Sequence, residues 1–267
     1  MSSLAVLAAQ VSDIAREAGH VIMAIYQQDF AIFDKADKSP LTEADLAAHN
    51  VIVAGLKSIS DLPILSEESA DIAWSERSQW QRYWLVDPLD GTKEFIKKNG
   101  EFTVNIALIE QGQPMLGVVY APVLDSLYVG IVGEQAYKVE NGQQSTINTA
   151  PHVSAERWKV VGSRSHQSPE IESFLAALDG DKELVAMGSS LKLCLVAEGR
   201  AHLYPRLGPT SEWDTAAAHA VVLAAGGSVT QLSVGQTPAQ ATQPLVYNQK
   251  ESLLNPFFLV SAQALNP

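Results

Sequence analysis

Apolar residues near the start of the chain recur every three or four positions, as on one face of an α-helix. This series predicts an amphipathic helix that ends before Asp29, and its members are Leu4, Leu7, Val11, Ile14, Ala18, Ile22 and Ile25. A second helix is expected to begin at Thr42, because a threonine followed three residues later by the acid Asp45 is typical of a helix start. The first helix is expected to be scaffold, whereas Asp45 is either a simple cap or part of a functional site.

The apolar period changes to two in the next part of the chain. Apolar and polar residues alternate over 102–108, and the apolar runs 115–122 and 126–133 follow after short turns. Asn141 and Gly142 mark a further tight turn. This pattern predicts an antiparallel meander.

Strands and helices alternate in the second half. The expected strands cover residues 158–161, 184–187, 202–204 and 257–261, and the expected helices run from after residue 166 to 178, over 189–197 with Ser189 as cap, and over 214–225. The fold class is therefore α+β, a layered sandwich with an antiparallel sheet in the first half and a mixed sheet in the second. Turn residues over 149–154 predict a division into 1–150 and 151–267.

Composition narrows the class of partner. A length of 267 residues suits one large domain or two closely packed halves, and a net charge of −12 argues against nucleic acid polymers and anionic membranes. The single cysteine, Cys194, excludes an internal disulfide and lies in an apolar helical pattern, which favours core packing. Neither a signal peptide nor an apolar run long enough to span a membrane is evident, so a cytoplasmic location is expected, either free or loosely associated with the inner face of the cell membrane. The oligomeric state is not indicated.

Two early strands end in acids. The apolar run 62–66 delivers Glu67 and its neighbour Glu68, and the run 84–86 is expected to stop at Asp87, where Pro88 begins a turn. Adjacent strand residues face opposite ways, so Glu68 is expected to be the solvated member of its pair.

A third acid lies close to Asp87 in the chain. Asp90 follows three residues later and precedes Gly91, so a turn would let both carboxylates face one point. Two carboxylates about 4 Å apart repel by about 4 kcal/mol at an effective dielectric near 20, which a bound cation offsets. Glu67 and Asp214, the latter at the start of an apolar helix, complete a pattern typical of an oxygen-ligand site for a hard cation. The alternative is a solvated turn.

Three acidic sequences carry a family resemblance: LSEES at 65–69, DPLDGT at 87–92 and WDTAA at 213–217. In these the chain resembles the lithium-sensitive, magnesium-dependent phosphatases of the inositol monophosphatase superfamily. Within it, DGTKEF, GSSLK and YPRLGP resemble the 3'(2'),5'-bisphosphate nucleotidases, most closely their bacterial CysQ type. The resemblance covers nearly the whole chain, and it implies a sandwich of the inositol monophosphatase-like kind that binds two or three magnesium ions.

The resemblance also implies roles for individual residues. The magnesium ligands would be Glu67, Asp87, the carbonyl of Leu89, Asp90 and Asp214. Glu67 and Thr92 would orient and activate the attacking water, and Asp45 would anchor the Thr92 hydroxyl. Backbone amides of Gly91 and Thr92 would hold the phosphate, with Asp214 on the leaving-group side.

Four further residues lie where the nucleotidases contact the nucleotide: His166, Ser189, Lys192 and Arg206. Each also has a structural explanation, since Ser189 is a possible helix cap and the other three are ordinary surface groups. Lys93 is a weaker candidate. The substrate-binding set implied by the resemblance comprises Glu67, Leu89, Asp90, Gly91, Thr92, His166, Ser189, Lys192, Arg206 and Asp214. His219, inside an apolar helix, is expected to be a satisfied core histidine.

These observations predict a magnesium-dependent phosphomonoesterase that removes the 3'-phosphate of adenosine 3',5'-bisphosphate, with 3'-phosphoadenylyl sulfate as a second substrate. A role in sulfate assimilation and nucleotide recycling is implied. The alternatives are inositol monophosphatase activity and a non-catalytic nucleotide-binding regulator. An acyl-transfer site at Ser189 and Lys192 is disfavoured because SDN and KTG are missing, and the three-residue spacing of Asp87 and Asp90 disfavours an aspartyl-phosphate enzyme of the haloacid dehalogenase type.

Overall fold

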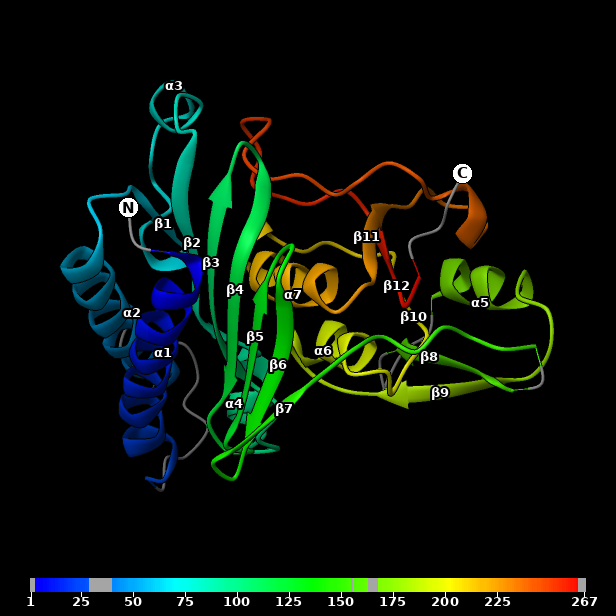
Figure 1. Cartoon of the computed structure of the whole chain (residues 1–267), viewed down its shortest axis with the longest axis horizontal. Helices are drawn as coiled ribbons and strands as arrows, with labels where there is room; N and C mark the ends of the chain where they lie inside the picture. Colours follow the sequence, from blue (N-terminus) through cyan, green and yellow to red (C-terminus); the bar gives the residue numbers. More distant parts are fainter. Residues whose placement is uncertain (1–2, 29–39, 155, 163–167, 264–267) are drawn as a thin grey trace.

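The protein is layered, with helices and sheets in alternation (Figure 1). The computed structural model describes residues 3–28, 40–154, 156–162 and 168–263. Helices α1 (Leu4–Tyr26) and α2 (Pro40–Ile59) cover one face of a seven-stranded sheet. Helices α6 (Leu191–Ala197) and α7 (Glu212–Ala224) lie between this sheet and a five-stranded sheet, and α5 (Pro169–Ala176) lies beyond the second sheet. The opening helix and the α+β layered class are confirmed.

The larger sheet is an antiparallel meander extended by one parallel strand. Its strands are, in spatial order, β1 (Ile64–Ser66), β2 (Arg82–Asp90), β3 (Thr103–Glu110), β4 (Gln113–Ala121), β5 (Ser126–Ile131), β6 (Gln135–Glu140) and β7 (Gln143–Thr146). The predicted meander and the turn at Asn141 and Gly142 are confirmed. Strand β1 pairs parallel to β2, because the connection between them crosses over through the short helices η1 (Glu67–Ser69) and α3 (Trp74–Arg77).

The smaller sheet is mixed, as predicted. Its order is β11 (Ser228–Gln231), β12 (Phe258–Ser261), β10 (Leu203–Arg206), β8 (Trp158–Gly162) and β9 (Lys182–Ala186). Strand β8 pairs in parallel with β9 and β10, whereas β12 is antiparallel to both its neighbours. Strand β11 and the short helix η2 (Pro238–Gln240) were not predicted, because four-residue segments with little apolar alternation carry almost no periodic signal.

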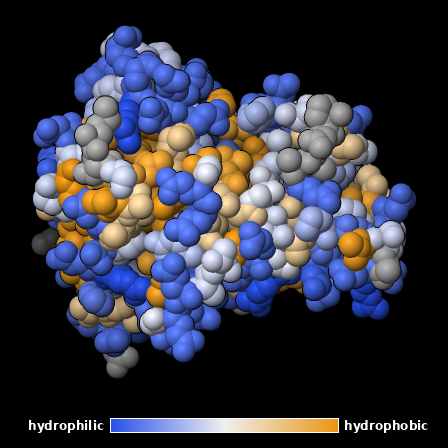
Figure 2. All heavy atoms as spheres, in the orientation of Figure 1, coloured by the Kyte–Doolittle hydropathy of each residue, from blue (hydrophilic) through white to orange (hydrophobic). Residues whose placement is uncertain are grey.

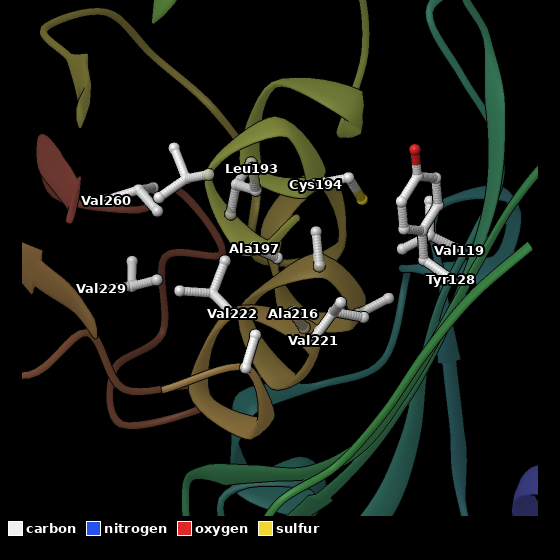
Figure 3. Packing of buried hydrophobic residues seen from close by; sticks show 14 of the residues in the cluster. Val119, Tyr128, Leu193, Cys194, Ala197, Ala216, Val221, Val222, Val229 and Val260 are labelled. Atoms are coloured by element: carbon white, nitrogen blue, oxygen red, sulfur yellow. The ribbon is translucent and has the colours of Figure 1, made fainter. Parts of the chain in front are cut away.

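Helices α6 and α7 fill the space between the sheets with small and branched side chains (Figure 3). Cys194 is fully buried there, which confirms its predicted place in the core. Helix α7 packs against β2 to β5 of the larger sheet and also against β11 of the smaller one. The division at residue 150 stays a prediction.

The surface is unevenly polar. In the view of Figure 2, hydrophilic residues cover the projection that carries α3, and hydrophobic residues gather nearer the middle of the molecule. Among the described residues, no helix is long and apolar enough to cross a membrane.

Two glycines let α7 approach the larger sheet closely. A Cβ atom built on Gly117 of β4 would lie 2.0 Å from the Ala217 carbonyl oxygen, and one on Gly130 of β5 would lie 2.4 Å from the Val221 Cα. Both obstructing atoms belong to the helix backbone, so they cannot move aside as a flexible side chain would. The absence of a side chain at these positions sets the distance at which α7 delivers its N-terminal end to the sheet.

We therefore expect Gly130→Ala to lower the free energy of unfolding by about 3 kcal/mol, because the new methyl group must push α7 away from β5. Gly162→Ala in β8 is the matched control, since among the described residues its Cβ would find only Leu184, at 3.8 Å. Urea unfolding of both variants checks this, and equal stability of the two would contradict the packing described.

Candidate active site

The two aspartates of DPLD lie within strand β2 and not in a turn beyond it. Asp87 pairs with Asn105 of β3 and Asp90 pairs with Thr103, so three steps along β2 oppose two steps along β3. This β-bulge inserts one extra residue. The predicted end of the strand at Asp87 was therefore wrong, since Pro88, which lacks an N–H, is accommodated in the bulge.

The bulge determines which way the carboxylates point. In a regular strand, residues three apart face opposite sides of the sheet. The extra residue brings Asp87 and Asp90 to the same side, opposite Asn105 and Thr103. Asp87 is buried and its Oδ1 accepts a hydrogen bond from the Leu89 backbone N–H at 3.1 Å. Two acids are thus fixed beside α6 and α7.

Asp90 is held by the loop that precedes α6. Its Oδ2 accepts hydrogen bonds from the Ser189 hydroxyl and, at 2.6 Å, from the Ser190 backbone N–H. The N-cap of α6 is Ser190, so the prediction of Ser189 as cap was wrong. Ser189 has φ +51°, a left-handed conformation that excludes the extended geometry of a usual capping residue.

Glu67 and Glu68 lie in the turn η1, directly after β1. Glu67 is exposed, whereas Glu68 is half-buried and shares a hydrogen bond with Asp45. The expectation that strand alternation leaves Glu68 solvated was wrong, because the chain becomes helical at Glu67. Helix α2 begins at Pro40, so Thr42 and Asp45 lie inside it and Asp45 is not a cap.

Asp45 lies next to both of these glutamates. Burial, then the charges of Glu68 and Glu67, raise the pKa of Asp45 to about 8. One of its oxygens, Oδ1, is buried without a hydrogen-bond partner among the described residues. The charges of the two neighbouring glutamates and the buried Oδ1 therefore indicate that Asp45 belongs to the acidic site.

Asp214 reaches the site from the first turn of α7. Its Oδ2 accepts a hydrogen bond from the Ser211 backbone N–H at 2.9 Å, as part of a capping box. Burial and the charge of Asp90 raise the pKa of Asp214 to about 7. Asp214 thus faces the acids of β2, although it lies about 120 positions after Asp90 in the chain.

The acids raise one another's pKa values. The pKa of Asp87 is raised well above its usual range by burial, then by Asp90, Glu67 and Asp214. Burial also raises the pKa of Glu67 and of Asp90, and the Ser189 hydrogen bond partly offsets the effect at Asp90. A divalent cation supplies the positive charge that this cluster needs in order to ionise.

The donor chemistry fits magnesium, which binds carboxylate and carbonyl oxygens. The side chains are nevertheless held by local hydrogen bonds, and in the described part of the chain no three His, Cys, Asp or Glu side chains are grouped so as to hold an ion. The ligand set of Glu67, Asp87, Leu89, Asp90 and Asp214 stays a prediction.

Gly91 and Thr92 connect β2 to helix α4 (Thr92–Ile96). Gly91 has φ +102°, and a Cβ atom there would lie 3.2 Å from the Glu101 carbonyl oxygen, so glycine is required on both counts. Thr92 is the exposed first residue of the helix. This position leaves its hydroxyl accessible, as the predicted role in orienting water requires.

Asp90 and Asp214 line a pocket of about 270 Å³ together with Ser189, Lys192 and Arg206. Lys192 and Arg206 also line an adjoining cavity of about 490 Å³. The apolar wall of that cavity includes Val160, Ile171, Leu184, Met187 and Leu207. Of these four charged residues, Asp90 and Asp214 line only the smaller pocket, whereas Lys192 and Arg206 line both hollows.

The two basic residues have unused capacity for an anion. The Nε of Arg206 is buried without a hydrogen-bond partner among the described residues, while its Nη2 donates to the Pro209 carbonyl at 3.0 Å. Burial, and also the Arg206 charge, lower the pKa of Lys192, whereas Asp90 raises it. His166 lies outside the described residues.

Some residues of the site were not predicted. Thr103 and Asn105 of β3 line the same side of the sheet as Asp87 and Asp90, and Tyr204 and Glu94 line both hollows. In the sequence, Thr103 and Asn105 looked like the polar half of an ordinary alternating strand. The available signal was their position, since polar residues on a strand buried on both faces are unusual.

His219 is a satisfied core histidine, as predicted. It is 2% exposed on α7, and its Nδ1 lies 2.8 Å from the Tyr247 hydroxyl. Burial lowers the pKa of His219 to about 3. Above pH 6.5 it is neutral in both folded and unfolded chains, but below that pH only the unfolded chain gains the proton.

His219 should therefore make the protein less stable as the pH falls from 6.5 toward 3. The expected loss between pH 6.5 and 4.5 is about 2 kcal/mol. His219→Asn removes this titration, so the difference in free energy of unfolding between wild type and variant should change with pH by that amount. A difference that stays constant over this range would contradict the neutral, buried state of His219.

The chain belongs to the inositol monophosphatase family, whose model matches residues 3–261. Over 255 residues it is 51% identical to the 3'(2'),5'-bisphosphate nucleotidase CysQ of Escherichia coli strain K12, covering 94% of this chain and 98% of the relative. The crystal structure of CysQ from Bacteroides thetaiotaomicron superimposes with a TM-score of 0.86 at 44% identity, covering 97% of both chains. An inositol monophosphatase from Zymomonas mobilis shares the fold, with a TM-score of 0.77 at 22% identity over 98% of this chain and 95% of that one. The predicted membership and the resemblance to the CysQ-type nucleotidases are confirmed.

Proposed function

We propose that this protein is a magnesium-dependent phosphomonoesterase that hydrolyses the 3'-phosphate of adenosine 3',5'-bisphosphate, giving AMP and phosphate. The observation that carries the proposal is that Lys192 and Arg206 line both the pocket that contains Asp90 and Asp214 and the larger cavity beside it. A substrate with two phosphates can place one beside the acids and the other beside the bases. The strong similarity to proteins named 3'(2'),5'-bisphosphate nucleotidase supports the same assignment.

Each acid has a role in the proposed reaction. When bound, magnesium would supply positive charge that makes water a better nucleophile and stabilises the leaving oxygen. Glu67, exposed at η1, would accept the proton of the attacking water, and the Thr92 hydroxyl would orient that water for in-line attack. Asp45 would fix the Thr92 hydroxyl.

The remaining acids and the backbone would hold the phosphate and the ions. Asp87, Asp90 and the Leu89 carbonyl would hold magnesium beside the phosphate, and Asp214 would do so on the leaving-group side. The backbone N–H groups of Gly91 and Thr92 would bind phosphate oxygens.

The nucleotide end of the site would use the basic residues and the cavity. Lys192 and Arg206 would bind the 5'-phosphate, with contributions from Ser189 and His166. The apolar wall of the 490 Å³ cavity would accept the base. We further propose 3'-phosphoadenylyl sulfate, in which a sulfate extends the 5'-phosphate, as a second substrate, together with a role in cytoplasmic sulfate assimilation and the lithium sensitivity of the superfamily.

The proposal is tested by phosphate release from adenosine 3',5'-bisphosphate and from inositol 1-phosphate, each with magnesium and with excess chelator. We expect rapid release from the nucleotide that stops when chelator is added, and slower release from inositol 1-phosphate. Preference for inositol 1-phosphate would keep the metal site but overturn the substrate. No release from either substrate would favour a nucleotide-binding regulator.

A further inference from the structure

A buried network of polar side chains joins the loop before α6 to strand β3. The Thr103 hydroxyl lies 2.6 Å from the Ser189 hydroxyl and 2.9 Å from the Ser190 hydroxyl. The Asn105 Oδ1 lies 2.8 Å from the Ser190 hydroxyl and 3.2 Å from the Thr103 hydroxyl. Thr103, Asn105 and Ser190 are 0%, 1% and 2% exposed. Three polar side chains are thus packed together in the interior, with the half-buried Ser189 at their edge.

The network ends on Asp90. Ser189 and Ser190, which contact Thr103, are the same residues that donate to the Asp90 Oδ2. Thr103 is also the residue directly opposite Asp90 across the β2–β3 pair. The two loop serines therefore hold the Asp90 carboxylate by hydrogen bonds. Thr103, which contacts the same serines, lies opposite Asp90 on β3.

The loop is held in a conformation that it would not adopt freely. Ser189 has φ +51°, which costs about 1 kcal/mol or more for a residue with a side chain. The residue before it, Gly188, lies so close to the segment preceding β3 that a Cβ would lie 2.9 Å from the Glu101 carbonyl oxygen. The hydrogen bonds of Thr103 to both serines offset this cost.

Stability alone does not explain Asn105. Its Nδ2 is buried without a hydrogen-bond partner among the described residues, and a buried unpaired amide donor costs about 1–3 kcal/mol. An apolar side chain would avoid that cost. The residue is therefore better explained by what it holds in place.

We propose that Thr103 and Asn105 are positioning residues for Asp90, which they orient toward a divalent cation by fixing the hydroxyls of Ser189 and Ser190. This inference rests on the metal site of the proposed function. Groups that orient a metal ligand typically change metal affinity about 10- to 100-fold when they are removed. The network would thus set the affinity for the ion without contacting it.

The test is Mn²⁺ binding to the substrate-free protein, followed by the loss of the free-ion signal in electron paramagnetic resonance. We expect Thr103→Val and Asn105→Leu to raise the Mn²⁺ dissociation constant about 10-fold. Thr103→Ser keeps the hydroxyl and should bind as the wild type does. Thr230→Val is the matched control, because it removes a buried strand hydroxyl that has no partner among the described residues, and it should leave binding unchanged.

The outcomes separate this inference from the proposed function. If the wild type and Thr103→Val bind Mn²⁺ equally, the positioning role is overturned while the metal site stands. If the wild type does not bind Mn²⁺ at all, both fail. Should Thr103→Val not fold, Ser190→Ala makes the same comparison, because it removes a hydroxyl bonded to Thr103 and Asn105 but keeps the amide on Asp90; unchanged binding there would equally overturn the role.

Discussion

Replacing Asp90 with asparagine is expected to lower turnover of adenosine 3',5'-bisphosphate by about 10³-fold or more while leaving the protein folded. A lost metal ligand removes several kcal/mol of transition-state stabilisation, and about 4 kcal/mol corresponds to 10³ in rate. Asparagine keeps an oxygen that can accept from Ser189 and Ser190, so the loop before α6 retains its contacts. The measurement is the steady-state rate at saturating magnesium.

Stability should move in the opposite direction to activity. Burial, and then Asp90, raise the pKa of Asp87 well above its usual range, so a neutral residue at 90 removes a repulsion. The variant should therefore unfold at the same temperature as the wild type or higher in magnesium-free buffer. Asp181→Asn, an exposed acid on the far side of the smaller sheet, is the control. Near-wild-type rates from Asp90→Asn would overturn the metal site.

The second large effect concerns substrate choice. Lys192→Met and Arg206→Met should each lower kcat/KM for adenosine 3',5'-bisphosphate about 10- to 100-fold, because each removes a charged hydrogen bond to the second phosphate. Inositol 1-phosphate has no second phosphate, so its slower hydrolysis should change by less than about threefold. The comparison is of kcat/KM for both substrates on each variant.

The exposed Lys182→Met variant on β9 controls for lost charge, and it should affect neither substrate. Equal losses on the two substrates would show that Lys192 and Arg206 support the acids and do not recognise the nucleotide. The Nε of Arg206, which is buried without a hydrogen-bond partner among the described residues, favours the larger loss on the nucleotide.

The long periodic helices and strands, and the identities of the acids, could be predicted from the sequence. The helical series of α1 and the alternation of β3 to β5 are strong because each spans several turns or pairs. The order of Glu67, the DPLD acids and Asp214 was also readable, since Glu67 and the DPLD acids follow apolar runs and Asp214 opens one. These features depend on local pattern, which one chain contains in full.

The features of the site that could not be predicted depend on contacts between segments that are distant in the sequence. The bulge that turns Asp87 and Asp90 to one side exists only in register with β3, so DPLD alone resembled a turn. In the sequence Ser189 resembled a helix cap. Its positive φ depends on packing with segments far away in the chain, so it could not be predicted. For the same reason, the contact of Thr103 with both serines became visible only when the two halves were placed together.

The central claim is tested most directly by hydrolysing adenosine 3',5'-bisphosphate with magnesium in water enriched in ¹⁸O and identifying both products by ³¹P nuclear magnetic resonance. Direct attack of activated water on the 3'-phosphorus predicts one ¹⁸O atom in the released phosphate and unlabelled 5'-AMP. Adenosine 3'-phosphate as product, or label in the nucleotide, would contradict attack of water on the 3'-phosphorus beside the acids.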